Sequence, residues 1–229
     1  MKFLVWNIRG LRQSSKKSIV KDLTSKLCPS ILALLETKLP EPNLQLIRIG
    51  ASGGIWMVWD PSEVTLHSYF IGLFFVTVLL SCISDGTPLK FTAVYGPTTS
   101  SLRSRLWSEL GHVASLSHPI WCLGGDFNVT RWSHEQNFSN SISPEMRDFS
   151  NFISRIELLD IPLQGSWFTW SNHASNPTLS KLDRFLLSLE WEDVFPRSSS
   201  LVLPKPTSDH CPILHDTAAI RRGPRPLQI

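Results

Sequence analysis

The stretch Trp-Cys-Leu-Gly-Gly-Asp-Phe-Asn at residues 121–128 joins an apolar segment to two glycines, a carboxylate and an amide. The apolar part, Ile120–Leu123, predicts a short strand. Gly124-Gly125-Asp126 fits either an ordinary turn or a functional loop at the end of that strand. A polar group directly after an apolar strand is held by a rigid element and still reaches solvent. The pattern matters because it recurs along the chain.

The same arrangement of an apolar strand with a polar side chain at its end occurs elsewhere. Asn7 follows Phe3–Trp6, and Glu36 follows the continuous apolar run Ile31–Leu35, which is typical of a strand buried on both faces. Further strands are predicted at Ile55–Trp59, Val64–Phe70, Phe74–Ile83, Leu89–Tyr95, Trp167–Trp170, Lys181–Leu187, Leu201–Leu203 and Cys211–Leu214, and helices at Ser15–Leu27, Ser101–Leu116 and Pro144–Leu158. The excess of strands predicts an α/β fold with a mixed sheet or two packed sheets, and helices outside.

The composition excludes several classes of protein. The chain has 229 residues, 42% of them hydrophobic, and a net charge of +3, so it is not a disordered chain and has a sizeable core. The most apolar stretch, Tyr69–Leu80, is shorter than the roughly 20 residues that span a bilayer. Met1-Lys2 leads into Phe3–Trp6 without the apolar region of a signal peptide. We therefore expect an intracellular protein with no membrane partner.

The charge is unevenly distributed. Residues 1–26 carry a net charge of +6, whereas residues 27–215 carry −5. A basic edge fits a phosphate-rich partner, but it also fits a solvated helix face. We expect the helix lysines to be only solvated: Lys16, Lys17, Lys21 and Lys26. Arg9 and Arg12, in contrast, stand beside Asn7 and border the predicted site.

The candidate residues are weak signals alone and stronger together. Glu36 alone fits an ordinary surface carboxylate, whereas Asp183 lies in an apolar segment, where a carboxylate needs a partner. His210 stands beside Asp209. Carboxylates and Asn7 offer the oxygen ligands that Mg²⁺ prefers, and histidine, tyrosine and asparagine add donors for a phosphate. The set indicates metal-assisted hydrolysis of a phosphodiester.

Seven motifs in order give the chain a family resemblance. They are Trp6-Asn7-Ile8-Arg9-Gly10, Leu35-Glu36-Thr37-Lys38, Val94-Tyr95-Gly96-Pro97, Gly125-Asp126-Phe127-Asn128, Phe168-Thr169-Trp170-Ser171-Asn172, Lys181-Leu182-Asp183-Arg184 and Ser208-Asp209-His210-Cys211-Pro212. Together they resemble the endonuclease/exonuclease/phosphatase superfamily, and within it the apurinic-like endonuclease domain of plant-type LINE (non-LTR) retrotransposons. The resemblance covers residues 1–215. Residues 216–229, with Gly223-Pro224-Arg225-Pro226, resemble the start of a linker towards a reverse transcriptase.

The resemblance implies a fold and an activity. The fold would be a four-layer α/β sandwich, in which two packed mixed β-sheets are flanked by helices. The activity would be Mg²⁺-dependent hydrolysis of DNA phosphodiester bonds that nicks target DNA, with Mn²⁺ as a second usable metal. We expect a nuclear monomer whose partner is DNA, and a reverse transcriptase domain in a full-length element that this chain does not include.

The resemblance also implies roles for individual residues. Glu36, Asn7 and Asp209 would hold the metal. The catalytic groups would be Asp126 and Asn128 at the attacking water and the scissile phosphate, Tyr95 and His210 on phosphate oxygens, and Asp183 holding the imidazole of His210. Substrate contacts would come from Arg9, from Asn172 and Thr169 on the DNA-facing rim, and from Ser208 behind the metal or phosphate.

Two alternatives stay open at this stage. The chain could be another hydrolase of the superfamily, such as an abasic-site repair nuclease or a phosphoesterase, or it could be an inert retrotransposon fragment that only binds nucleic acid. Among the tryptophans, we expect Trp167 and most others in the core and Trp132 at the surface.

Overall fold

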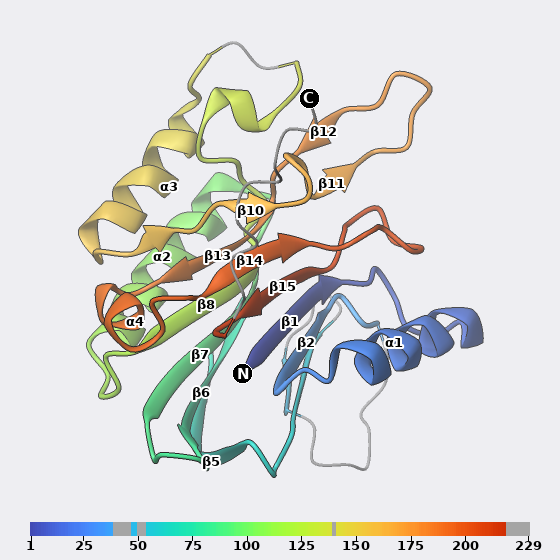
Figure 1. Cartoon of the computed structure of the whole chain (residues 1–229). Helices are drawn as coiled ribbons and strands as arrows, with labels where there is room; N and C mark the ends of the chain where they lie inside the picture. The colour runs from blue at the N-terminus through green and yellow to red at the C-terminus, as the bar shows by residue number, and fades with distance from the viewer. Residues whose placement is uncertain (39–46, 50–53, 139–140, 219–229) are drawn as a thin grey trace, which may run out of the picture.

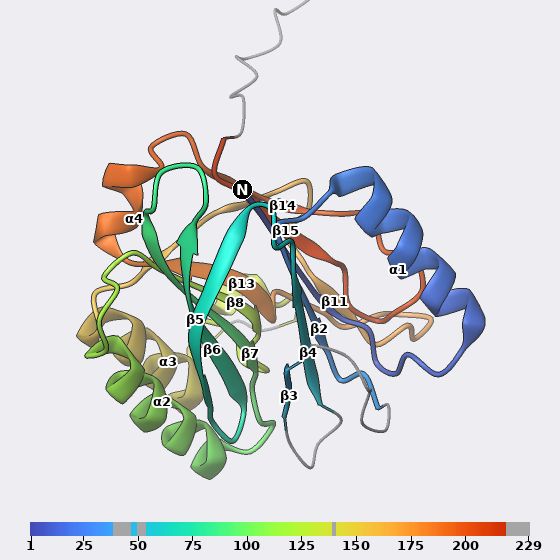
Figure 2. The same cartoon turned by 90° about the horizontal axis from the view of Figure 1, so that it is seen from below.

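Two β-sheets pack face to face in the computed structural model, and helices cover their outer faces (Figures 1 and 2). The structure describes residues 1–38, 47–49, 54–138 and 141–218. In Figure 2 the helix α1 lies beside one sheet, whereas α2 and α3 lie over the other. The prediction of a four-layer α/β sandwich is therefore confirmed.

The first sheet has seven strands in the order β10-β14-β15-β1-β2-β4-β3, with both parallel and antiparallel pairs. Its strands are β1 (Lys2–Asn7), β2 (Ile31–Leu35), β3 (Ile47–Ile49), β4 (Ile55–Trp59), β10 (Leu163–Gln164), β14 (Ser199–Val202) and β15 (Ile213–Asp216). The antiparallel pair of β1 and β15 brings the two ends of the described domain together, since Lys2 lies opposite Asp216. Of the tail predicted to begin at residue 216, residues 219–229 lie outside the described residues.

The second sheet has six strands in the order β5-β6-β7-β8-β13-β9. Its strands are β5 (Val64–Ile71), β6 (Phe75–Cys82), β7 (Pro88–Tyr95), β8 (Trp121–Asp126), β13 (Asp183–Leu187) and β9 (Leu159–Asp160). A separate hairpin of β11 (Trp170–Ser171) and β12 (Leu179–Ser180) stands at one end of the sandwich (Figure 1).

Three longer helices form the outer layers. They are α1 (Ser14–Leu27), α2 (Ser100–Ala114) and α3 (Pro144–Arg155), and the short α4 (Leu189–Val194) and a 3-10 turn (Ser133–Glu135) complete the helical segments of the described residues. The start of α3 matches its sequence signals, because Ser143 Oγ accepts the N–H of Met146 at 3.2 Å and Pro144 occupies the first turn. No helix in the described ranges has both the length and the apolarity to cross a membrane.

The apolar runs are continuous because side chains alternate between the two faces of each strand and both faces are buried. Phe3 and Val5 of β1 belong to the core between the two sheets, whereas Leu4 and Trp6 pack under α1. A central strand of this fold therefore buries both faces, as the run Ile31–Leu35 predicts.

The two glycines of the opening motif are part of β8 and do not form a turn. A Cβ at Gly124 would lie 2.6 Å from the ring of Phe185, and one at Gly125 would lie 2.0 Å from the carbonyl oxygen of Val94. Only glycine allows this close approach of neighbouring chains. The strand therefore continues to Asp126 and carries that carboxylate to its end.

Two local predictions are wrong. The strand predicted at Trp167–Trp170 is reduced to Trp170–Ser171, and Trp167 is 82% exposed instead of lying in the core. The sequence pattern also gives no signal for β3, β9, β10 or α4, because segments of two to six residues show too little periodicity.

Candidate active site

The ends of strands from both sheets meet at one end of the sandwich. In the six-stranded sheet, Asp126 at the end of β8 lies opposite Tyr95 of the parallel β7 and opposite Asp183 of the antiparallel β13. In the other sheet, β1 and β2 are parallel, and Asn7 lies opposite Leu35, the residue before Glu36. Strand pairing therefore gathers Tyr95, Asp126 and Asp183 in one sheet and Asn7 and Glu36 in the other. The hydrogen bond from Asn7 Nδ2 to Asp126 Oδ2 at 3.0 Å joins the two groups.

His210 lies between two buried carboxylates. Its Nδ1 is 2.9 Å from Oδ2 of Asp183, and its Nε2 is 3.6 Å from Oδ2 of Asp126. Burial lowers the pKa of the imidazole, but the charges of Asp183 and Asp126 act in the opposite direction and prevail, so the pKa of His210 is raised to about 9. The imidazole is therefore protonated at neutral pH and can donate a hydrogen bond to an anion.

Asp126 contacts several members of the polar cluster. Its Oδ2 accepts a hydrogen bond from Asn7 Nδ2 at 3.0 Å, and its Oδ1 accepts one from the backbone N–H of Asn128 at 2.9 Å. Burial raises the pKa of Asp126 to about 6, although the charge of His210 opposes the shift. A carboxylate with a pKa in this range is suited to accept a proton near neutral pH.

Asn128 is fixed in an unusual backbone conformation. Its φ is 51°, in the left-handed region, and its Nδ2 donates to the carbonyl oxygen of Gly96 at 2.7 Å. The amide is thus held beside Asp126 by the loop that follows β7.

Glu36 also has a left-handed backbone, with φ 53°, and its carboxylate pairs with Lys38 Nζ at 2.7 Å. Tyr95 is near it, and burial raises the pKa of the phenol, with the charges of Glu36 and Asp126 adding to the shift. The Tyr95 hydroxyl therefore stays protonated and can act as a donor.

Asp209 lies in the loop before β15. Its Oδ2 accepts a hydrogen bond from Trp170 Nε1 at 3.0 Å and contacts the guanidinium of Arg9. Burial alone would raise the pKa of Asp209, but the bond from Trp170 and the charges of His210 and Arg9 lower it. Ser208 Oγ donates to the carbonyl oxygen of Asn7 at 2.7 Å, so it ties this loop to the end of β1.

Thr169 does not line the rim, and its prediction as a substrate contact is wrong. The side chain is fully buried, and its Oγ1 accepts the backbone N–H groups of Leu182 and Asp183, both at 3.0 Å. Thr169 therefore positions the carboxylate that holds His210. Asn172 is exposed in the β11–β12 loop, where its Oδ1 accepts the N–H of Thr178 at 3.0 Å.

Other contributors had weak sequence signals or none. Trp6 Nε1 donates to the carbonyl oxygen of His210 at 3.1 Å, although its sequence predicts only a core residue. The prediction that the helix lysines are only solvated is wrong for Lys16, whose Nζ donates to the carbonyl oxygens of Ile8 at 2.7 Å and Arg9 at 3.1 Å. These contacts link segments distant in sequence or depend on the path of a turn, so local patterns do not predict them.

Two groups of side chains could hold a cation. Asp126, Asp183 and His210 offer ligand atoms that all lie within 4.8 Å of one another. The imidazole binds a metal only in its neutral form, whereas its two carboxylate neighbours favour the protonated form. This triad is therefore better described as a histidine paired with two carboxylates.

Glu36, Asp209 and Asn7 fit a hard divalent cation better. Both carboxylates already attract a positive group, Lys38 in one case and Arg9 in the other. Asn7 Oδ1 accepts one hydrogen bond, from the N–H of Arg9 at 3.1 Å, which leaves a second lone pair. The donor set therefore has the oxygen chemistry and the negative charge that Mg²⁺ or Mn²⁺ prefers.

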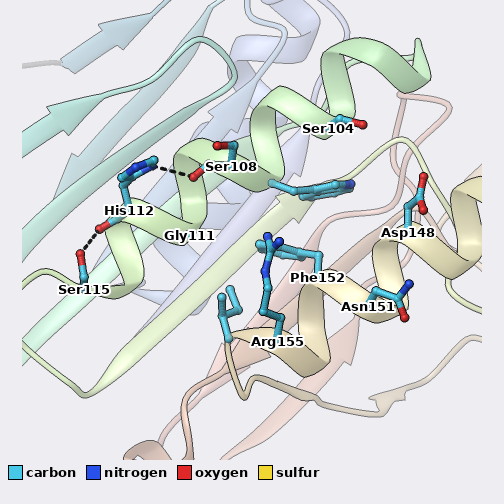
Figure 3. A pocket seen from close by; sticks show the side chains of 11 residues that line it. Ser104, Ser108, Gly111, His112, Ser115, Asp148, Asn151, Phe152 and Arg155 are labelled. Atoms are coloured by element: carbon cyan, nitrogen blue, oxygen red, sulfur yellow. Dashed lines mark hydrogen bonds between the residues drawn. The ribbon is translucent and has the colours of Figure 1, made fainter.

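A separate pocket lies on the outer surface between α2 and α3 (Figure 3). Its volume is about 690 Å³, and Trp107 and Phe152 stack beside it with ring centroids 4.6 Å apart. His112 and Ser108 are joined in it by a bond within the helix, from Nδ1 to a backbone oxygen at 2.8 Å. None of the predicted site residues lines this pocket.

The model of the Endonuclease/Exonuclease/phosphatase family matches residues 4–210. No curated protein sequence matches the chain.

Solved structures share the fold at low sequence identity. The endonuclease domain of TRAS1, a telomere-specific non-LTR retrotransposon, superposes with a TM-score of 0.74 at 13% identity, covering 94% of this chain and 97% of that chain. The 3′ phosphatase NExo from Neisseria, bound to a product DNA hairpin, gives 0.71 at 17% identity, covering 94% and 98%. D. rerio TDP2 in complex with a single-strand DNA product gives 0.65 at 13% identity, covering 94% and 97%.

Proposed function

The chain belongs to the endonuclease/exonuclease/phosphatase family, and we propose on that basis that it is a metal-dependent DNA endonuclease that nicks target DNA. The observation that carries the proposal is the position of His210 between the buried carboxylates of Asp126 and Asp183, at the point where the strand ends of both sheets meet. The ordered motifs that resemble plant-type LINE endonucleases support a retrotransposon origin, and a nuclear location is proposed with it.

The residues divide the work of phosphodiester hydrolysis. Asp126 orients the attacking water and accepts its proton, since its pKa is near neutrality. His210 and Tyr95 donate hydrogen bonds to phosphate oxygens, where negative charge increases in the transition state. Asn128 holds the orientation of Asp126, and Asp183 keeps the imidazole in the charged form.

Glu36, Asn7 and Asp209 would hold Mg²⁺ or Mn²⁺ beside the phosphate. A bound divalent ion supplies Lewis-acid stabilisation of the charge on the phosphate and the leaving oxygen. The product end is a 3′-hydroxyl, which can prime DNA synthesis.

Nicking of supercoiled plasmid tests the proposal. We expect the purified chain to convert plasmid to the open-circular form with Mg²⁺ or Mn²⁺ but not with EDTA. Glu36→Gln should lower the rate at least 10²-fold, because it removes a metal ligand and a charge. Glu109→Gln on α2, a partly exposed carboxylate that pairs with Arg105 at 3.1 Å, is the matched control and should nick at the wild-type rate. Plasmid that stays supercoiled, or Glu36→Gln with full activity, contradicts the proposal.

Phosphatases of the same fold support a second candidate activity. The structural relatives include the 3′ phosphatase NExo and a mannosyl-6-phosphatase from Bacteroides thetaiotaomicron, the latter at a TM-score of 0.61 and 13% identity. Duplexes that carry either an abasic site or a 3′-phosphate distinguish the two. Faster incision at the abasic site than in plain duplex, or removal of the 3′-phosphate, favours a repair nuclease or phosphoesterase. Salt-sensitive DNA binding without turnover identifies an inert fragment.

A further inference from the structure

Two cations of the chain occupy the carboxylates assigned to the metal. Lys38 Nζ lies 2.7 Å from Glu36 Oε1, and Arg9 Nη1 contacts Asp209 Oδ2. The carboxylate side chains are only 12% and 7% exposed, whereas those of Lys38 and Arg9 are 50% and 58% exposed. The carboxylates are thus fixed inside the site, and the cations reach them from solvent.

The backbone beneath these two cations is held in place. Arg9 and Lys38 both have left-handed φ values, 49° and 52°. The two loops are joined, because Gly10 N–H donates to Glu36 O at 2.7 Å and Arg12 Nε donates to Lys38 O at 3.1 Å. The side chains of Arg9 and Lys38 can therefore leave the carboxylates by rotation about their own bonds, without movement of the loops.

Long flexible cations are weak competitors for such a site. The cation of each pair is at least half exposed, so solvent screening and side-chain entropy offset much of its attraction to the carboxylate. A divalent ion carries twice the charge of each cation and binds carboxylate oxygens directly. It would therefore displace both side chains at a modest loss of its own affinity.

We propose that Arg9 and Lys38 are resident counter-ions of the metal-free site, and that metal binding releases them to contact DNA phosphates beside the scissile bond. This inference rests on the proposed metal-dependent nuclease function and adds a coupling between its two ligands. Because linkage is reciprocal, metal and DNA each strengthen the binding of the other.

The first experiment measures metal affinity without DNA or turnover. Free Mn²⁺ is followed by electron paramagnetic resonance during titration of the wild type, Arg9→Gln, Lys38→Gln and Lys17→Gln. Arg9→Gln and Lys38→Gln should each bind Mn²⁺ about 1.5- to 5-fold more tightly than wild type. Lys17→Gln removes an exposed charge from α1 and should leave the affinity unchanged.

The second experiment distinguishes metal-dependent release of Arg9 and Lys38 from the general effect of removing a positive charge. Binding of a fluorescent duplex is measured against salt concentration in EDTA and in Ca²⁺, with the duplex checked for intactness. In Ca²⁺, Arg9→Gln and Lys38→Gln should each reduce the slope of log Kd against log salt by about 0.9, as expected for one lost phosphate contact. In EDTA, both should match the wild-type slope, because the side chains are then engaged with Asp209 and Glu36.

Equal slope changes in EDTA and Ca²⁺, or variants with wild-type Mn²⁺ affinity, would overturn the inference and leave the proposed nuclease function intact. Failure of the wild type to bind Mn²⁺ at all would overturn both.

Discussion

Two histidines five positions apart have opposite environments. His210, in the loop before β15, lies between Asp183 and Asp126, and its pKa is raised to about 9. His215, within β15, is fully buried between the sheets, and burial lowers its pKa to about 4. The same side chain is thus a cation at the polar end of the sandwich and a neutral core residue in its interior.

The packing around His215 explains the difference. Its ring lies 5.3 Å from Phe185 and 5.4 Å from Trp191, measured between centroids, and Nδ1 is 2.9 Å from Ser200 Oγ. Nε2 has no hydrogen-bond partner among the described residues. A second proton would place an unpaired charge in an apolar core. The contrast teaches that the number of carboxylates around each imidazole, and not its place in the strand, decides whether it can act on a phosphate.

Removing the partner of His210 should have the largest effect. Asp183→Asn removes the charge that most strongly raises the pKa of His210, so nicking should fall about 10²-fold or more at pH 8. The rate should also decline with rising pH at a lower pH than in the wild type, because the imidazole loses its proton earlier. A pH–rate profile for plasmid nicking measures both, and a profile identical to wild type would show that Asp183 is only structural.

His215 should make the fold sensitive to acid. Its pKa is lower in the folded chain than the ordinary 6.5, so the unfolded chain binds more protons between about pH 4 and 6.5, and stability falls as the pH falls. The loss at pH 4 amounts to about 3 kcal/mol. His215→Phe removes this contribution, so urea denaturation should show a smaller loss between pH 7 and 4.5 than in the wild type. Equal losses in the two proteins would contradict the assignment.

The hydroxyl of Thr169 should connect stability to activity. Thr169→Val leaves the N–H groups of Leu182 and Asp183 without their acceptor and should destabilise the fold by about 1–3 kcal/mol. Nicking should also fall, because the carboxylate beside His210 loses its support. Thr169→Ser keeps the hydroxyl and should recover most of both, as measured by thermal unfolding and plasmid nicking. Full activity of Thr169→Val would show that the Thr169 hydroxyl does not support the carboxylate beside His210.

The smallest effect is expected for Ser200→Ala, which removes the hydroxyl beside His215. Loss of the Ser200–His215 hydrogen bond should cost about 1 kcal/mol of stability. Nicking below the unfolding temperature should be unchanged, and a large loss of activity would show that the two regions are coupled.

The sequence predicts much of the polar region because its residues follow strand ends. Asn7, Glu36 and Asp126 each come after an apolar run, and the parallel pairing of strands brings such positions to one edge. The pairing of Asp183 with His210 is also expected, since a carboxylate in an apolar strand needs a partner.

Other features depend on contacts that no local pattern encodes. The resemblance places Thr169 on the DNA-facing rim, but its side chain is buried and its hydroxyl accepts the N–H of Asp183. The sequence predicts Trp167 in the core, yet the strand begins only at Trp170 and leaves Trp167 exposed in the segment before it. Nothing in the sequence around His215 shows that three aromatic rings from other segments, including Phe3 at 6.2 Å, will enclose it.

Nicking by a matched pair of histidine variants tests the central claim most directly. Wild type, His210→Ala and His215→Phe are incubated with supercoiled plasmid and Mg²⁺ at pH 7.5, below the unfolding temperature of each. The account predicts at least a 10²-fold loss for His210→Ala and wild-type nicking for His215→Phe. Equal activity of His210→Ala and wild type, or no metal-dependent nicking by the wild type, would contradict it.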